Sequence, residues 1–186
     1  MLRTEPHLAT RGTIDGMTPG TNIISLTAAA AKRADSPPFS AFVHAGQLFT
    51  SAAPTVVSTI LGSCVAVCLW DPSRRTGGVN HYLLPRWTGQ GEASLRFGNI
   101  AIATLIADLV TRGCRPRDLR ARVYGGAAGV AAGGASPGEF SAQNVAVARR
   151  LLRAAGIRVA SEDVGGDRSR KVMFRTDDGS VTVRTV

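Results

Sequence analysis

The sequence predicts an α+β domain in which short β-strands are grouped before and after two helices. Two apolar runs rich in β-favouring residues flank a polar turn, which is typical of an antiparallel hairpin. Two segments with apolar residues at helical spacing follow, and three short strand candidates end the chain. This grouping favours a mixed or antiparallel sheet in a single domain.

The chain has 186 residues, which is enough to bury one core. Residues 1–38 mix Thr, Gly, Pro and Ala with scattered charge, so we expect a poorly ordered extension with a short helix at Ala28–Arg33. The folded domain is predicted over residues 39–186. No apolar stretch reaches the roughly 18 residues of a membrane helix, and no secretory signal is evident, so we expect a cytoplasmic protein that does not insert into the membrane.

Four strand candidates occupy the first half of the predicted domain. Short apolar runs bounded by small and polar residues predict the first two. The hairpin supplies the other two, because its turn contains Pro, Ser and two Arg, with a Gly pair behind it. A polar, Gly-rich surface loop is expected next, at Thr88–Glu92. The four candidates are Gln47–Thr50, Thr55–Ile60 and the hairpin runs 61–72 and 77–85.

Two helices are predicted in the second half. The first carries Leu and Ile at helical spacing and ends before Gly113, and the second starts at Ser141 as its N-cap and ends before Gly156. The Gly-rich loop before Ser141 lacks both Gly-Lys-Ser/Thr and G-x-G-x-x-G, so we expect a compact turn and no phosphate cradle. The expected elements are helices 94–111 and 141–155, and strands 119–124, 157–162, 171–175 and 180–185.

The hairpin places a cysteine near a histidine. With the turn centred between Pro72 and Ser73, Cys64 lies directly opposite His81. Opposed side chains have Cβ atoms about 4.5–5.5 Å apart, so a thiol and an imidazole there can share a proton. The alternative is a buried structural Cys beside a satisfied His, and a slip of one residue would turn His81 to the other face.

The remaining Cys and His residues have simpler interpretations. Three cysteines without an export signal predict free thiols rather than a disulfide framework. Cys64, Cys68 and His81 lack a fourth ligand and the usual close Cys pair, so no metal site is predicted. Cys68 is interpreted as core, His44 as an exposed loop residue and Cys114 as incidental.

The net charge of +9 indicates attraction to an acidic protein partner. The arginines are dispersed, and the few aromatic residues do not interleave with them as a stacking platform requires. We therefore do not expect a nucleic-acid-binding module. The adjacent Glu162-Asp163 is interpreted as a charged turn or an ion pair with Arg168 or Arg170.

Several motifs resemble the CheD family of chemoreceptor glutamine deamidases. The resemblance spans about residues 41–186, and the motifs occur in the family's order. They are Leu61-Gly62-Ser63-Cys64-Val65-Ala66-Val67-Cys68-Leu69, Asp71-Pro72, Asn80-His81-Tyr82-Leu83-Leu84-Pro85, Gly125-Gly126-Ala127, Gln143-Asn144-Val145, Gly156-Ile157, the run from Glu162 to Arg168, and Val181-Thr182-Val183-Arg184.

The resemblance implies a fold, an activity and three site residues. The family's fold is a sandwich of mixed sheets with flanking helices. Its members use a Cys to attack selected glutamine side chains of methyl-accepting chemotaxis receptors, with a His as base. Cys64 and His81 match these two positions. A Thr six residues before the Cys corresponds to Ser58, with Thr59 beside it, so either hydroxyl can serve as the third residue.

The expected chemistry needs no cofactor. His81 takes the thiol proton to form an ion pair, and backbone N–H groups around Ser63-Cys64 stabilise the oxyanion, where Gly62 permits close approach. The alternative function is a non-catalytic chemotaxis adaptor that binds receptors or a CheC-type phosphatase. Relatives of this family bind such phosphatases, so the two roles are compatible.

Overall fold

The computed structural model describes residues 23–26, 39–128 and 137–186. The predicted helix at Ala28–Arg33 and most of the predicted extension lie outside this part of the chain. The strands are β1 (Ile23–Leu26), β2 (Phe39–Phe42), β3 (Gln47–Ser51), β4 (Thr55–Leu61), β5 (Val65–Asp71), β6 (Thr76–Tyr82), β7 (Arg120–Gly125), β8 (Arg158–Val164), β9 (Arg170–Arg175) and β10 (Val181–Thr185). The helices are α1 (Gly98–Thr111) and α2 (Pro137–Ala154), with a 3₁₀ turn, η2, at Pro116–Asp118.

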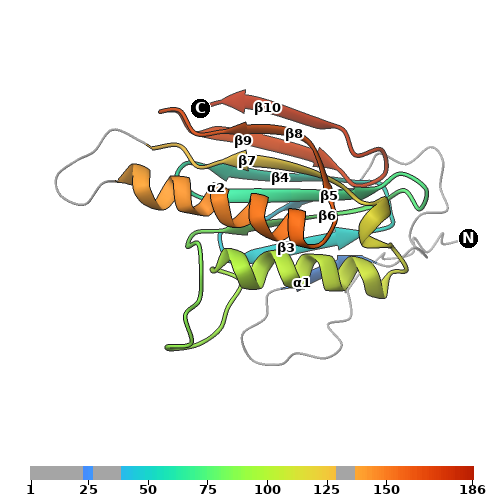
Figure 1. The fold of residues 1–186 in the computed structure, drawn as a ribbon. Coiled ribbons are helices and arrows are strands. Elements are labelled where there is room, and N and C mark those ends of the chain that lie inside the picture. The colour runs from blue at the N-terminus through green and yellow to red at the C-terminus, as the bar shows by residue number, and fades with distance from the viewer. Residues whose placement is uncertain (1–22, 27–38, 129–136) are drawn as a thin grey trace, which may run out of the picture.

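The strands form two mixed sheets, which confirms the predicted α+β sandwich. The larger sheet has the order β1-β3-β6-β5-β7-β8, with parallel pairs at its two edges, and the smaller has the order β10-β9-β4-β2. Both helices lie on one side, against the larger sheet (Figure 1). Strand β1 lies within the predicted extension and adds a parallel edge strand beside β3, which the sequence analysis did not predict.

Two apolar cores lie on opposite faces of the larger sheet. The face toward the helices contributes Val65, Val67 and Tyr82, which pack with Ile102 and Leu105 of α1. The other face contacts the smaller sheet. Its core contains Phe49, Val57, Leu61, Ala66, Cys68, Val79, Val172 and Phe174. Alternate residues of each central strand therefore belong to different cores, as the period of two requires.

The register of the hairpin differs from the prediction by two residues. Strands β5 and β6 pair Val65 with Tyr82 and Ala66 with His81, so Cys64 is not directly opposite His81. The Asp71 carboxylate accepts hydrogen bonds from the backbone N–H groups of Ser73 and Arg74, at 2.9 and 3.1 Å, which places the turn one residue later than predicted. Because the shift is even, His81 stays on the predicted face.

Both helices begin at positions other than those predicted. Helix α1 starts at Gly98 rather than Ser94, because the backbone of Leu84 pairs with Phe97 and its carbonyl accepts a hydrogen bond from the Gly98 N–H at 2.8 Å. Helix α2 starts at Pro137, so Ser141 is not its N-cap. The Ser141 hydroxyl donates to the Ala127 carbonyl at 2.9 Å and joins the helix to the Gly-rich loop.

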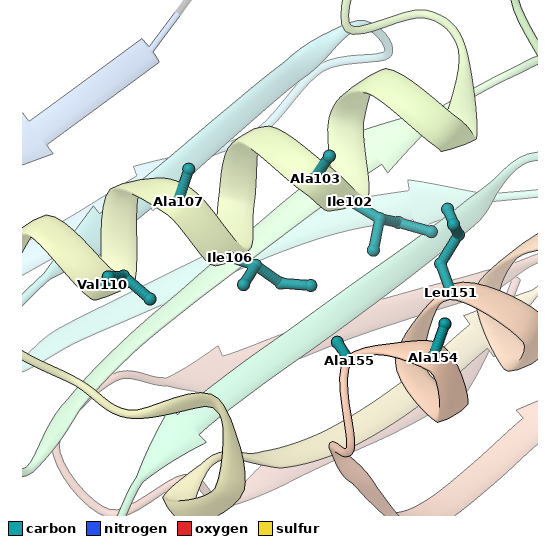
Figure 2. Close-up of a pocket in the computed structure, with 8 residues that line it drawn as sticks. All are labelled: Ile102, Ala103, Ile106, Ala107, Val110, Leu151, Ala154 and Ala155. Carbon is teal, nitrogen blue, oxygen red and sulfur yellow. The ribbon is translucent and has the colours of Figure 1, made fainter.

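An apolar groove of about 450 Å³ runs between the two helices on their outer side (Figure 2). Side chains of both helices line it, among them Ile106 of α1 and Leu151 of α2 together with the small Ala103 and Ala154. In the described part of the chain, no helix is long and apolar enough to cross a membrane.

The core between the sheets predicts a large stability effect at Phe174. This side chain is fully buried, so Phe174→Ala is expected to reduce the free energy of unfolding by about 3–5 kcal/mol. The matched control is Phe140→Ala on α2, where the ring is 52% exposed and a change within about 0.5 kcal/mol is expected. Urea unfolding measures both, and equal losses would contradict this account of the core.

Candidate active site

The nucleophile candidate lies in a short loop, residues 62–64, between β4 and β5. The Cys64 carbonyl accepts a hydrogen bond from Gly126 N–H, and the Gly62 carbonyl accepts one from Ala127 N–H, both at 2.8 Å. Gly125 has a φ of 106°, and a Cβ there would come within 2.2 Å of the Cys64 carbonyl oxygen. Only glycine permits this close approach, so the Gly125-Gly126 pair holds the cysteine loop in place.

The turn that follows β8 supports the same two glycines. Gly165 N–H donates to the Gly125 carbonyl at 2.9 Å, and the guanidinium of Arg170 donates to the Gly165 carbonyl at 2.7 Å. Arg170 also pairs with Asp163 at 2.9 Å, which connects the smaller sheet to the larger one. Gly125 and Gly126, at the start of the predicted compact turn, thus support the cysteine loop, whereas residues 129–136 of that turn lie outside the described residues.

His81 is held from the opposite sheet by Thr59. His81 is 5% exposed, and its ring Nδ1 lies 2.9 Å from Thr59 Oγ1. The Thr59 hydroxyl donates its own proton to the Val43 carbonyl at 2.8 Å, so it accepts from His81 Nδ1–H. This network assigns the proton to Nδ1 and leaves a lone pair on Nε2, which is buried without a hydrogen-bond partner in the described residues.

Of the two candidate hydroxyls, only Thr59 contacts His81. Adjacent residues of β4 point to opposite faces, and Thr59 shares the inner face with the buried Val57 and Leu61. Ser58 faces away from the larger sheet and is partly exposed. The structure therefore places Thr59, and not Ser58, in the candidate site.

Burial favours the neutral forms of both Cys64 and His81. Burial raises the pKa of the Cys64 thiol, although the Ser63 hydroxyl and the Cys64 N–H oppose this in part. Burial lowers the pKa of His81, partly countered by the Val43 carbonyl, and the nearby His44 lowers it further. Both pKa shifts favour the neutral pair over the predicted ion pair, and in the described residues no hydrogen bond joins His81 Nε2 to the thiol.

The other titratable candidates lie outside this site. Cys68 is in the core between the sheets, and burial raises its pKa to about 12. Burial and Asp71 raise the pKa of Cys114 to about 11. His44 is exposed and its ring packs against Phe42, with centroids 4.7 Å apart. In the acidic pair, Glu162 binds Arg149 and Asp163 binds Arg170. Over the described ranges, no group of three or more Cys, His, Asp or Glu could hold a metal ion.

Asn144, for which no role was predicted from the sequence, lies next to the cysteine loop. Its side chain is buried and its amide nitrogen contacts the Ser63 carbonyl at 3.3 Å and the Leu83 carbonyl at 2.8 Å. A signal was present, because a polar Asn stands directly before Val145 in the apolar stripe of a predicted helix. Such a residue is expected to have a buried hydrogen-bond partner.

The fold and site define a two-sheet α+β protein with a loop cysteine and a buried, oriented histidine near one end of the sandwich. The family model described as CheD chemotactic sensory transduction matches residues 83–185. A relative from Sulfurimonas denitrificans, a probable chemoreceptor glutamine deamidase CheD, is 40% identical and aligns over 78% of this chain and 93% of its own. The chain belongs to the CheD family.

Two further relatives carry the same family name. The probable chemoreceptor glutamine deamidase CheD 1 of Anaeromyxobacter dehalogenans is 47% identical, over 77% of this chain and 82% of its own. The probable chemoreceptor glutamine deamidase CheD of Rhodospirillum rubrum is 44% identical, over 78% of this chain and 81% of its own. Among solved structures, the hypothetical protein YfiH of Bacillus licheniformis has a TM-score of 0.43 and 18% identity, over 64% of this chain and 51% of that one.

A neutral resting thiol predicts a particular alkylation profile for Cys64. Because its pKa is raised, the rate of reaction with iodoacetamide is expected to increase continuously from pH 6 to 9 without a plateau near neutrality. His81→Ala is expected to change the rate at pH 7 by less than about threefold, since no ion pair is lost. Peptide mapping distinguishes Cys64 from the buried Cys68 and Cys114. A plateau below pH 7 that disappears in His81→Ala would contradict the neutral pair.

Proposed function

We propose that this protein hydrolyses glutamine side chains of chemoreceptors to glutamate, with Cys64 as nucleophile and His81 as general base. The substrate class is supported by the names of the relatives, which are probable chemoreceptor glutamine deamidases. The observation that carries the chemistry is the orientation of His81. Thr59 occupies Nδ1 and leaves the lone pair on Nε2. The partly exposed Cys64 lies two residues before Ala66, which pairs with His81, and so belongs to the same face of the hairpin.

The reaction begins with a neutral pair. As Cys64 Sγ attacks the glutamine Cδ, its proton passes to His81 Nε2, and the C=O becomes a tetrahedral oxyanion. The imidazolium then gives this proton to the amide nitrogen, and the C–N bond breaks. Ammonia departs, and the glutamyl group remains bound to Cys64 as a thioester. His81 next takes a proton from water as the hydroxide adds to the thioester carbon. Collapse of this second tetrahedral intermediate expels the Cys64 thiolate, which takes the proton back from the His81 imidazolium. Glutamate is then released.

Backbone N–H groups of the cysteine loop are proposed to stabilise the oxyanion. Within the ranges that the structure describes, the N–H groups of Ser63 and Cys64 make no backbone hydrogen bond, so both are available to a ligand. The Cys64 N–H also lowers the pKa of the thiol that it precedes, against the larger effect of burial. Donors fixed before the reaction stabilise developing charge without reorganisation.

Thr59 is proposed to orient the base. Its hydroxyl holds Nδ1–H and so directs the Nε2 lone pair away from the smaller sheet. This corresponds to the third group of a catalytic triad, which sets the tautomer and the ring position.

The partner and the compartment follow from the substrate class. We propose the cytoplasmic domains of chemoreceptors as substrates and the cytoplasm as location, with a CheC-type phosphatase as a second partner on the family resemblance. The net charge of +9 favours acidic surfaces on either partner.

The nucleophile and base are tested on a receptor cytoplasmic fragment that contains glutamines. Wild type is expected to convert discrete glutamines to glutamate, and Cys64→Ala and His81→Ala to lose at least about 10³-fold in rate, because each removes a covalent or proton-transfer step. Peptide mass spectrometry measures the mass increase at each glutamine. Cys114→Ala serves as the control cysteine variant and is expected to retain activity. Unchanged conversion by Cys64→Ala would rule out Cys64 as the nucleophile. No conversion by wild type would leave the adaptor role as the better account.

The role of Thr59 is tested by a pair of adjacent substitutions. Thr59→Val keeps the shape but removes the hydroxyl that orients His81, so kcat is expected to fall by about 10- to 100-fold. Ser58→Ala, on the other face of β4, is expected to change kcat by less than about threefold. Initial rates on the same receptor fragment compare the two, and a larger loss for Ser58→Ala would reverse the assignment.

A further inference from the structure

The ladder between β5 and β6 ends beside the cysteine loop and leaves two carbonyl groups on neighbouring segments. Its last pair is Val65 with Tyr82. Beyond this pair, the Ser63 carbonyl lies directly before Cys64, and the Leu83 carbonyl lies directly after β6, the strand that carries His81. Two carbonyls are both acceptors and cannot bond to each other, so this end of the hairpin needs a donor from elsewhere.

Helix α2 supplies this donor through Asn144. Its Nδ2 lies 2.8 Å from the Leu83 carbonyl and 3.3 Å from the Ser63 carbonyl. The Tyr82 hydroxyl donates to the Asn144 backbone carbonyl at 2.8 Å, which fixes the helix against the hairpin. Both side chains are almost fully buried. A primary amide suits the position because it offers two N–H groups to two acceptors.

The bond to Ser63 also determines where the next N–H points. In a trans peptide the C=O and the following N–H point in opposite directions. The Ser63 carbonyl points toward the Asn144 amide on α2, so the Cys64 N–H points away from that helix. The Cys64 sulfur lies on that other side, packed partly against the core between the sheets.

We propose that Asn144 is a positioning residue that orients the Ser63–Cys64 peptide so that the Cys64 N–H serves as an oxyanion donor. This inference rests on the proposed deamidase function. Asn144 touches neither the substrate nor the thiol, and it acts through the peptide that it holds. Its loss is therefore expected to affect the transition state rather than substrate binding or thiol reactivity.

The kinetic test compares matched substitutions on α2. Asn144→Ala removes both donors, and Asn144→Asp removes them while keeping the volume. Gln143→Ala and Gln143→Glu make the same changes one residue away on the exposed face. Both Asn144 variants are expected to lower kcat for the receptor fragment by about 10- to 100-fold, with KM and the Cys64 alkylation rate within about threefold. The Gln143 variants are expected to match wild type.

Three outcomes would overturn the proposal. These are an unchanged kcat, an effect confined to KM, and a loss of alkylation rate as large as the loss of kcat, which would indicate general disruption of the loop. Circular dichroism and urea unfolding verify that each variant is folded. If Asn144→Asp does not fold because of its buried charge, Asn144→Ala carries the comparison.

A spectroscopic measurement separates this inference from the proposed function. Loss of the hydrogen bond from Asn144 Nδ2 to the Ser63 carbonyl is expected to shift the ¹³C resonance of that carbonyl upfield. The shift is expected in the folded Asn144 variants and not in the Gln143 variants. If wild type converts no glutamine, the deamidase proposal fails, while this shift still shows whether Asn144 holds the peptide. An unchanged Ser63 resonance would overturn the inference whatever the activity.

Discussion

The hydrogen bond between Thr59 and His81 joins the two sheets, and the candidate site depends on it. Thr59 belongs to the smaller sheet and His81 to the larger one, so the base is oriented only when the sandwich is closed. The contact between Thr59 and the Val43 carbonyl completes the arrangement, because it leaves Thr59 Oγ1 as an acceptor. One buried hydroxyl thereby links assembly of the fold to the tautomer of the base.

The cysteine loop is held by segments that are far apart in sequence. The Gly125-Gly126 pair binds it from β7, the Gly165 turn supports that pair, and Asn144 binds it from the helix layer. The direct contacts from Gly126 and Asn144 use backbone carbonyl groups of the loop. The cysteine side chain thus stays free of these supports, while the peptide that carries it is fixed on several sides.

Local patterns predicted both helices and every strand from β3 onward, but neither β1 nor β2. They also predicted the face of His81, because period-two alternation survives an error of two residues in register. They did not predict which of Ser58 and Thr59 contacts the base, since adjacent strand residues face opposite ways and the choice depends on which side of β4 meets the other sheet. The predicted start of α2, at Ser141, was wrong because it also depends on contacts that are distant in sequence. Ser141 has the chemistry of an N-cap, yet its hydroxyl is used in a contact with Ala127 that local sequence does not encode.

Burial gives the resting site a physical advantage for a neutral substrate. An ion pair between Cys64 and His81 would have to lose its hydration when a glutamine amide covered it, which costs free energy before any bond forms. The raised pKa of Cys64 and the lowered pKa of His81 both favour the neutral forms, which avoids this cost. Charge develops only as sulfur attacks carbon, and at that moment the loop N–H groups and His81 Nε2 are the groups placed to receive it. The contacts that hold the cysteine loop are therefore expected to affect the stability of the transition state more than substrate binding.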